Sequence, residues 1–182
     1  MSSRTTDGQT QKSVALVGFM AVGKSKIGRL LAQRLELPFV DTDKQIEEAL
    51  GRSIADIFRE QGESVFREAE RDSIARLIAG EAQVIAVGGG AFVDAANRRA
   101  LNANARTVWL DAPFELILVR LARSSHRPLA SNRTETELRT LWEARREYYS
   151  AAHVRVEVSD EDPDATVARI LSALRLPPAP TA

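Results

Sequence analysis

The sequence has 182 residues, with 25 Lys and Arg side chains against 25 Asp and Glu, and it has no cysteine. This length fits one domain with its own core. The balanced charge argues against nonspecific electrostatic binding to nucleic acid. The composition excludes disulfides, and neither a membrane span nor a signal peptide is visible. We therefore expect a cytoplasmic protein without nucleic-acid or membrane partners. As a separate expectation, we take it to be a monomer. Its single domain should cover 12–177, between a disordered tail at 1–11 and a flexible tail at 178–182.

Apolar runs alternate with helical patterns along the chain. In chain order, we expect a strand at 14–17, a helix at 24–35, a strand at 39–40, helices at 43–50, from 54 and at 63–78, a strand at 84–87, a strand at 107–110, helices at 113–122 and 138–149, a strand at 154–158 and a helix at 163–174. This alternation predicts an α/β fold of three layers, with a central parallel sheet between helices. Ligands of such folds bind beyond the carboxyl ends of the strands, which is where the polar motifs fall.

Residues 18–25 read GFMAVGKS, which fits G-x-x-x-x-G-K-[ST] between a predicted strand and a predicted helix. Backbone N–H groups of such a loop bind phosphate oxygens, and glycines let the backbone approach them. The lysine neutralises the β- and γ-phosphates, and the serine hydroxyl ligates Mg²⁺. A glycine-rich turn that fits by chance is the alternative, which the strand and helix on either side disfavour. The residues predicted to bind the nucleotide here are Gly18, Ala21, Val22, Gly23, Lys24, Ser25 and Lys26.

Two aspartates follow the second predicted strand, in the order Asp41-Thr42-Asp43. In an extended chain their carboxylates share one face, so one could serve Mg²⁺ while the other meets an acceptor hydroxyl. The alternative is helix capping, with Thr42 and Gln45 as a capping box and the acids in the first turn. The two interpretations are compatible.

Arg67 and Glu70 lie three residues apart on a predicted helix. This spacing fits a surface ion pair, or a guanidinium fork for a substrate carboxylate that Glu70 orients. The triplet at 88–90, which is all glycine, fits either a mobile loop or a backbone that lies against a ligand.

A polar stretch follows the helix predicted at 113–122, and we interpret about 122–135 as a mobile lid. A lid could bring an arginine to the transferring phosphoryl group, although a solvated basic loop is the alternative. Farther along, Arg145 and Arg146 lie near the end of a predicted helix, where cations favour the macrodipole.

The order and spacing of these motifs resemble the shikimate kinase family over nearly the whole chain. The motifs are GFMAVGKS at 18–25, FVDTD at 39–43, SIADIF at 53–58, GESVFREAE at 62–70, GGGAF at 88–92, RPL at 127–129 and RREYY at 145–149. The resemblance implies a P-loop kinase fold. It also implies transfer of a phosphoryl group from ATP, with Mg²⁺, to the 3-hydroxyl of shikimate in aromatic amino-acid biosynthesis.

The resemblance also implies roles for individual residues. Asp43 would orient or deprotonate the acceptor hydroxyl, while Ser25 and Asp41 would serve Mg²⁺. Arg127 would be the lid arginine near the phosphates, and Arg120 would lie against the adenine. The resemblance implies that shikimate is bound by Asp43, Phe58, Phe66, Arg67, Gly88, Gly89, Gly90 and Arg145.

One departure from the family pattern bears on these roles. Glu147-Tyr148 stands where proline-leucine is usual, so the motif leaves open whether Arg145 or Arg146 contacts the substrate. Two other functions compete with the one implied. A gluconate or nucleoside monophosphate kinase would share the fold, whereas a nucleotide-dependent switch should carry D-x-x-G and N-K-x-D motifs, which we do not find.

Overall fold

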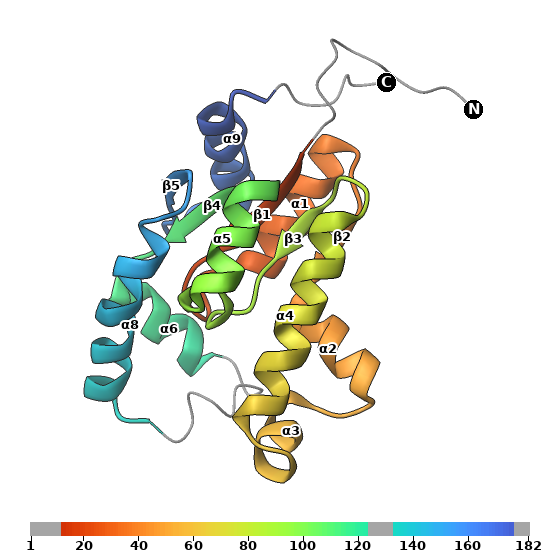
Figure 1. Cartoon of the computed structure of the whole chain (residues 1–182). Coiled ribbons are helices and arrows are strands. Elements are labelled where there is room, and N and C mark those ends of the chain that lie inside the picture. Colours follow the sequence, from red (N-terminus) through yellow and green to blue (C-terminus); the bar gives the residue numbers. More distant parts are fainter. Residues whose placement is uncertain (1–11, 124–132, 177–182) are drawn as a thin grey trace.

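The computed structural model describes residues 12–123 and 133–176 (Figure 1). The tails predicted at 1–11 and 178–182 lie outside these ranges, as do Arg127 and most of the lid predicted at about 122–135. Across the described residues, every helix is too short or too polar to cross a membrane.

A parallel sheet forms the centre of the fold. In chain order the elements are β1 (Ser13–Val17), α1 (Lys24–Leu35), β2 (Phe39–Asp41), α2 (Thr42–Leu50), α3 (Ile54–Glu60), α4 (Glu63–Ala79), β3 (Val84–Ala86), the 3₁₀ helix η1 (Ala91–Val93), α5 (Ala95–Asn104), β4 (Ala105–Asp111), α6 (Phe114–Ala122), α8 (Glu135–Tyr149), β5 (Val154–Glu157) and α9 (Pro163–Leu174). The five strands pair in the order β2-β3-β1-β4-β5, all parallel. The predicted α/β fold is therefore confirmed.

Helices cover both faces of this sheet (Figure 1). Helices α1 and α9 contact each other on one face, and α4 and α5 contact each other on the opposite face. Every residue of β1 is buried, as a central parallel strand covered on both faces requires. A second, smaller apolar cluster of Ile46, Ile57 and Phe66 holds α2, α3 and the start of α4 together beside the sheet.

The sequence analysis missed one helix, α5, together with the short η1 before it. The side chain of Asp94 caps α5 by accepting from the N–H groups of Ala96 and Asn97. Only Asn97 and Leu101 of this helix are buried, so it carries no apolar stripe of the kind that a periodicity search detects. A capping signal was the available clue.

The predicted capping role of Thr42 is wrong. Asp41 is the N-cap of α2, and its carboxylate accepts from the N–H of Asp43. Thr42 is fully buried, and its hydroxyl accepts from the N–H of Gly88 at 2.9 Å. Gln45, the other half of the proposed capping box, accepts instead from the hydroxyl of Ser73. The start of α2 is therefore tied to the glycine triplet, a contact between distant parts of the chain.

Candidate active site

The phosphate loop connects β1 to α1 and ends at the first turn of that helix. Gly18 has φ 144° and Gly23 has φ 106°, values that side chains rarely allow. A Cβ at Gly18 would also lie only 2.5 Å from the carbonyl oxygen of Leu110 in β4. The Nζ of Lys24 donates to the carbonyls of Gly18 and Phe19 at 2.8 and 2.9 Å, so the lysine folds back over the loop. The loop thus has the backbone shape and the cation that bind phosphate groups.

Ser25 and Asp41 meet beside this loop. The hydroxyl of Ser25 donates to Oδ2 of Asp41 at 2.5 Å, although the residues are 16 apart in sequence. These are the hard oxygen donors that Mg²⁺ prefers, and Mg²⁺ usually takes only one or two protein ligands beside phosphates and water. The described ranges hold no group of three or more His, Cys, Asp or Glu side chains suited to a metal.

Asp43 lies one residue into α2, where its carboxylate faces the glycine triplet. A Cβ at Gly88 would lie 2.5 Å from Oδ1 of Asp43 and 3.1 Å from Oε1 of Glu70. Burial raises the pKa of Asp43 above its usual value, while Lys24 nearby lowers it. A carboxylate with a raised pKa beside a phosphate loop has the character of a general base.

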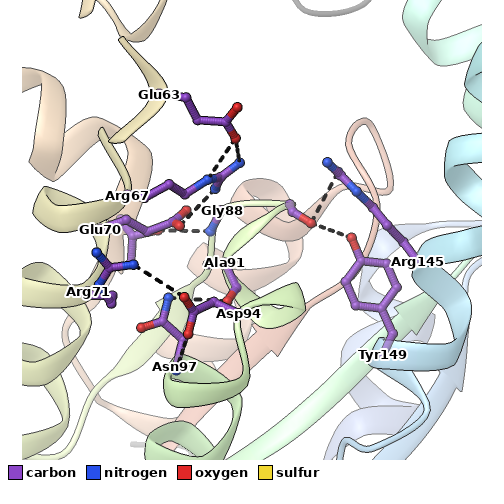
Figure 2. A network of polar contacts seen from close by, with 12 residues as sticks. Glu63, Arg67, Glu70, Arg71, Gly88, Ala91, Asp94, Asn97, Arg145 and Tyr149 are labelled. Carbon is purple, nitrogen blue, oxygen red and sulfur yellow. Dashed lines mark hydrogen bonds and ion pairs between the residues drawn. The ribbon is translucent and has the colours of Figure 1, made fainter. Parts of the chain in front are cut away.

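Arg67 on α4 is held by two carboxylates (Figure 2). Its Nη1 donates to Glu70 at 2.9 Å, and Nε and Nη2 donate to Glu63 at 3.1 and 3.0 Å. The Glu70 side chain is only 1% exposed, so the interpretation of this contact as a surface pair is wrong. Burial raises the pKa of Glu70, and its buried Oε1 accepts no hydrogen bond from the described protein groups. The fork of Arg67 is therefore aimed by a buried partner.

The glycine triplet separates Arg67 from Arg145. Figure 2 shows the two arginines, from α4 and α8, on opposite sides of the loop that begins at Gly88. A Cβ at Gly90 would lie 2.8 Å from Nη1 of Arg67, and Nη1 of Arg145 donates to the carbonyl of Gly89 at 3.3 Å. None of the three glycines has a positive φ, so Gly88 and Gly90 serve to leave room for Asp43 and Arg67, whereas a Cβ at Gly89 would make only ordinary contacts.

The neighbouring arginines of α8 have different surroundings. Arg146 donates to both carboxylate oxygens of Asp111, at 2.6 and 3.0 Å, and lies between the rings of Trp109 and Trp142. Arg145 instead faces Gly89 and the ring of Phe19 in the phosphate loop. The geometry thus favours Arg145 over Arg146 as the residue that faces the site.

Tyr149 is a site residue that the sequence analysis did not single out. Its hydroxyl donates to the carbonyl of Gly89 at 2.5 Å, beside Arg145 (Figure 2). The sequence clues were its place at the end of the RREYY motif and its spacing of four residues from Arg145, which places both side chains on one face of a helix.

The two predicted pocket phenylalanines lie against each other near the start of α4. The ring centroids of Phe58 and Phe66 are 5.0 Å apart, and the guanidinium carbon of Arg67 lies 5.2 Å from the Phe66 ring. Phe66 is buried whereas Phe58 is partly exposed. They form an apolar wall next to the arginine fork.

Arg120 of α6 contacts the outer side of the phosphate loop. It donates to the carbonyls of Val22 and Ser159, at 2.8 and 3.1 Å, and so connects this loop to the segment after β5. Lys26 is exposed on α1, and Arg127 lies outside the described residues. Ala21 takes a positive φ of 61° within the loop.

These features define a class. A phosphate loop on a parallel sheet of this strand order, with a serine in the first turn of α1 and two aspartates at the junction of β2 and α2, defines a P-loop phosphotransferase. A sequence model of shikimate kinase matches residues 20–175. The chain belongs to the shikimate kinase family, whose members use ATP as the phosphoryl donor.

Individual relatives agree with this assignment. The shikimate kinase of Paramagnetospirillum magneticum is 46% identical over 168 residues, which cover 92% of this chain and 86% of the relative. The structure of the shikimate kinase of Acinetobacter baumannii in complex with shikimate has a TM-score of 0.87 and 36% identity, covering 91% of this chain and 94% of the other. A gluconokinase from Sinorhizobium meliloti has a TM-score of 0.56 at 16% identity, which shows a shared fold alone.

Proposed function

We propose that this enzyme transfers the γ-phosphoryl group of ATP to the 3-hydroxyl of shikimate. The observation that carries this proposal is the glycine triplet with Asp43 against it and an arginine on either side. Arg67 and Arg145 together offer two cations to an anionic acceptor, while Asp43 lies close enough to Lys24 of the phosphate loop for this cation to lower its pKa. A small molecule that carries both a carboxylate and a hydroxyl fits this arrangement.

The protein groups divide the work of transfer. Lys24 and the N–H groups of the phosphate loop stabilise the charge on the β- and γ-phosphates. The acceptor hydroxyl gives its proton to Asp43 as its oxygen forms a bond to the γ-phosphorus. The bond from that phosphorus to the β-γ bridging oxygen breaks, and ADP leaves with the electron pair. We further propose that Arg127 approaches the phosphates and that Arg120 flanks the adenine.

Specificity for the acceptor comes from the guanidinium pair. Arg67 is fixed by Glu63 and Glu70, so its fork is already oriented before substrate binds. Removing Arg67 or Arg145 deprives a bound carboxylate of one of its two partners, which costs about 1–3 kcal/mol. We expect alanine at either position to raise the KM for shikimate far more than the KM for ATP.

We propose that Ser25 and Asp41 hold Mg²⁺. Their oxygen atoms are already within 2.5 Å of each other beside the phosphate loop. When bound, the ion would supply positive charge for the β- and γ-phosphate oxygens. A Mg²⁺ titration of activity tests this assignment. Asp41→Asn should recover partly at high Mg²⁺, while Asp43→Asn should show a low kcat at every concentration. Equal recovery in both variants would contradict this division between the aspartates.

The experiment that tests the whole proposal is a coupled assay of ADP release against a panel of acceptors. Shikimate should support turnover with ATP and Mg²⁺, whereas gluconate and nucleoside monophosphates should not. Turnover with gluconate or a nucleotide in place of shikimate would refute the proposed substrate. We also propose that the enzyme works as a monomer.

A further inference from the structure

The hydroxyl of Tyr149 lies at the glycine triplet, on the side of the site that we propose for the acceptor. Tyr149 is the last residue of α8, its side chain is 1% exposed, and its hydroxyl donates to the carbonyl of Gly89 at 2.5 Å. Arg145, one turn earlier on the same helix, donates to the same carbonyl at 3.3 Å. Figure 2 shows both side chains converging on this one oxygen from α8.

The two hydrogen bonds are unequal. The Tyr149 hydroxyl lies well within hydrogen-bonding distance of the carbonyl, whereas the Arg145 bond is near the limit of a hydrogen bond and therefore weak. Burial raises the pKa of Tyr149 to about 12, and Arg145, which also interacts with the phenol oxygen, lowers it by less, so the phenol keeps its proton and remains a donor at neutral pH. Its ring packs beside that of Trp109 in β4, with centroids 6.2 Å apart, which fixes the direction of the hydroxyl.

We propose that Tyr149 is a positioning residue for the acceptor, because its hydrogen bond to Gly89 releases Arg145 to bind the carboxylate. If Tyr149 satisfies the carbonyl of Gly89, Arg145 can turn away from it without leaving that oxygen unpaired. Without the phenol hydroxyl, Arg145 would be the remaining donor at this carbonyl. The carbonyl and the substrate would then compete for one guanidinium. This inference rests on the proposed function, since it assumes a carboxylate-bearing acceptor.

The test compares Tyr149→Phe with Tyr148→Phe, a matched control at the neighbouring position. Tyr148 is 38% exposed and lies against Arg98 instead of the site. We expect Tyr149→Phe to raise the KM for shikimate about tenfold, with the KM for ATP unchanged and kcat within about twofold. The control should match the wild type. An unchanged KM for shikimate in Tyr149→Phe, or equal rises in both KM values, would overturn the inference.

A double-mutant cycle with Arg145→Ala tests whether Tyr149 acts through that arginine. In the Arg145→Ala background, Tyr149→Phe should change the KM for shikimate less than about twofold, because the competition no longer exists. Additive effects would overturn the inference. A wild-type enzyme that does not phosphorylate shikimate would instead refute the proposed function. Wild-type turnover combined with an unaffected Tyr149→Phe refutes only the role of Tyr149.

A second measurement avoids the loss of the hydroxyl, in case Tyr149→Phe folds poorly. The chain has two tyrosines, so 3-fluorotyrosine incorporated into Tyr148→Phe labels Tyr149 alone. Saturating shikimate should shift the single ¹⁹F resonance, because Arg145 moves away from the shared carbonyl. Gluconate, as a control for ionic strength, should leave it in place. A resonance that shikimate does not move would count against any coupling between Tyr149 and the acceptor.

Discussion

Alanine at Gly88 and alanine at Gly90 should damage two different steps, although the two positions are only two residues apart. A Cβ at Gly88 would lie 2.5 Å from Oδ1 of Asp43, and a Cβ at Gly90 would lie 2.8 and 2.9 Å from the terminal nitrogens of Arg67. The first substitution therefore pushes on the proposed base. The second pushes on the guanidinium of Arg67, which we propose binds the acceptor's carboxylate.

The size of each effect follows from the movement required. Reaching ordinary contact moves the Asp43 carboxylate by roughly 1 Å, and a misplacement of about 1 Å can cost about 100-fold in rate. We expect Gly88→Ala to lower kcat by about that factor, with the KM for ATP unchanged. Arg67 must move by roughly half as much, and its long side chain can adjust. Gly90→Ala should raise the KM for shikimate about tenfold and leave kcat within a few fold.

The assay is steady-state kinetics with each substrate varied in turn, together with melting temperatures. Gly80→Ala is the control, because a Cβ there meets its nearest atoms, the carbonyl oxygens of Arg76 and Leu77, at an ordinary 3.6 Å. This variant should behave as the wild type. A Gly88→Ala enzyme with wild-type kcat would refute the reasoning. So would a Gly90→Ala enzyme impaired in kcat alone.

Three other substitutions probe the phosphate loop, the base and the support of α8. Lys24→Ala should keep less than about a tenth of wild-type turnover in the coupled assay, because a lost transition-state charge contact costs at least about 2 kcal/mol. Asp43→Asn should be nearly inactive yet melt at a higher temperature at pH 7. Its raised pKa means that the folded state loses stability as the pH rises and this carboxyl ionises. That gain should vanish below pH 3.8, where the carboxyl of the wild type is protonated both folded and unfolded, and a gain that persists there would contradict the argument. Arg146→Ala should lower the free energy of unfolding by roughly 1 kcal/mol in urea melts, since buried Asp111 loses its bidentate partner and keeps only Arg155. Its KM for shikimate should stay near wild type, and an equal loss of stability in Arg145→Ala would argue against the distinction.

The sequence predicted best what depends on a few consecutive residues. The phosphate loop and α1 were predicted with the correct bounds, because the glycines, the lysine and the apolar spacing of that helix are all local signals. Helix α9 was also placed correctly from Pro163 to Leu174. By contrast, α5 was missed because burial of so few of its residues leaves no periodic pattern.

Features that depend on distant contacts could not be predicted from a single sequence. The bond from Gly88 to Thr42 joins residues 46 apart, so the local capping pattern gave the wrong role to this hydroxyl. The difference between Arg145 and Arg146 arises because adjacent helical residues point about 100° apart. Which of them faces the glycine triplet is decided by Asp111 in β4, a partner that no local pattern names. The partly unpaired carboxylate of Glu70 is likewise visible only once the sheet and α4 are packed together.

The contacts of Arg146 also bear on which part of the site tryptophan fluorescence can monitor. Both tryptophans in the sequence, Trp109 and Trp142, have the same guanidinium against their rings, at 5.1 and 4.6 Å from the ring centroids. Tryptophan emission therefore comes entirely from the junction of β4 and α8, one turn from the arginine proposed to bind the acceptor. A fluorescence titration would register displacements of α8, while movements of α2 and α3 at the other side of the site would pass unseen. Binding curves obtained in this way would describe one wall of the pocket.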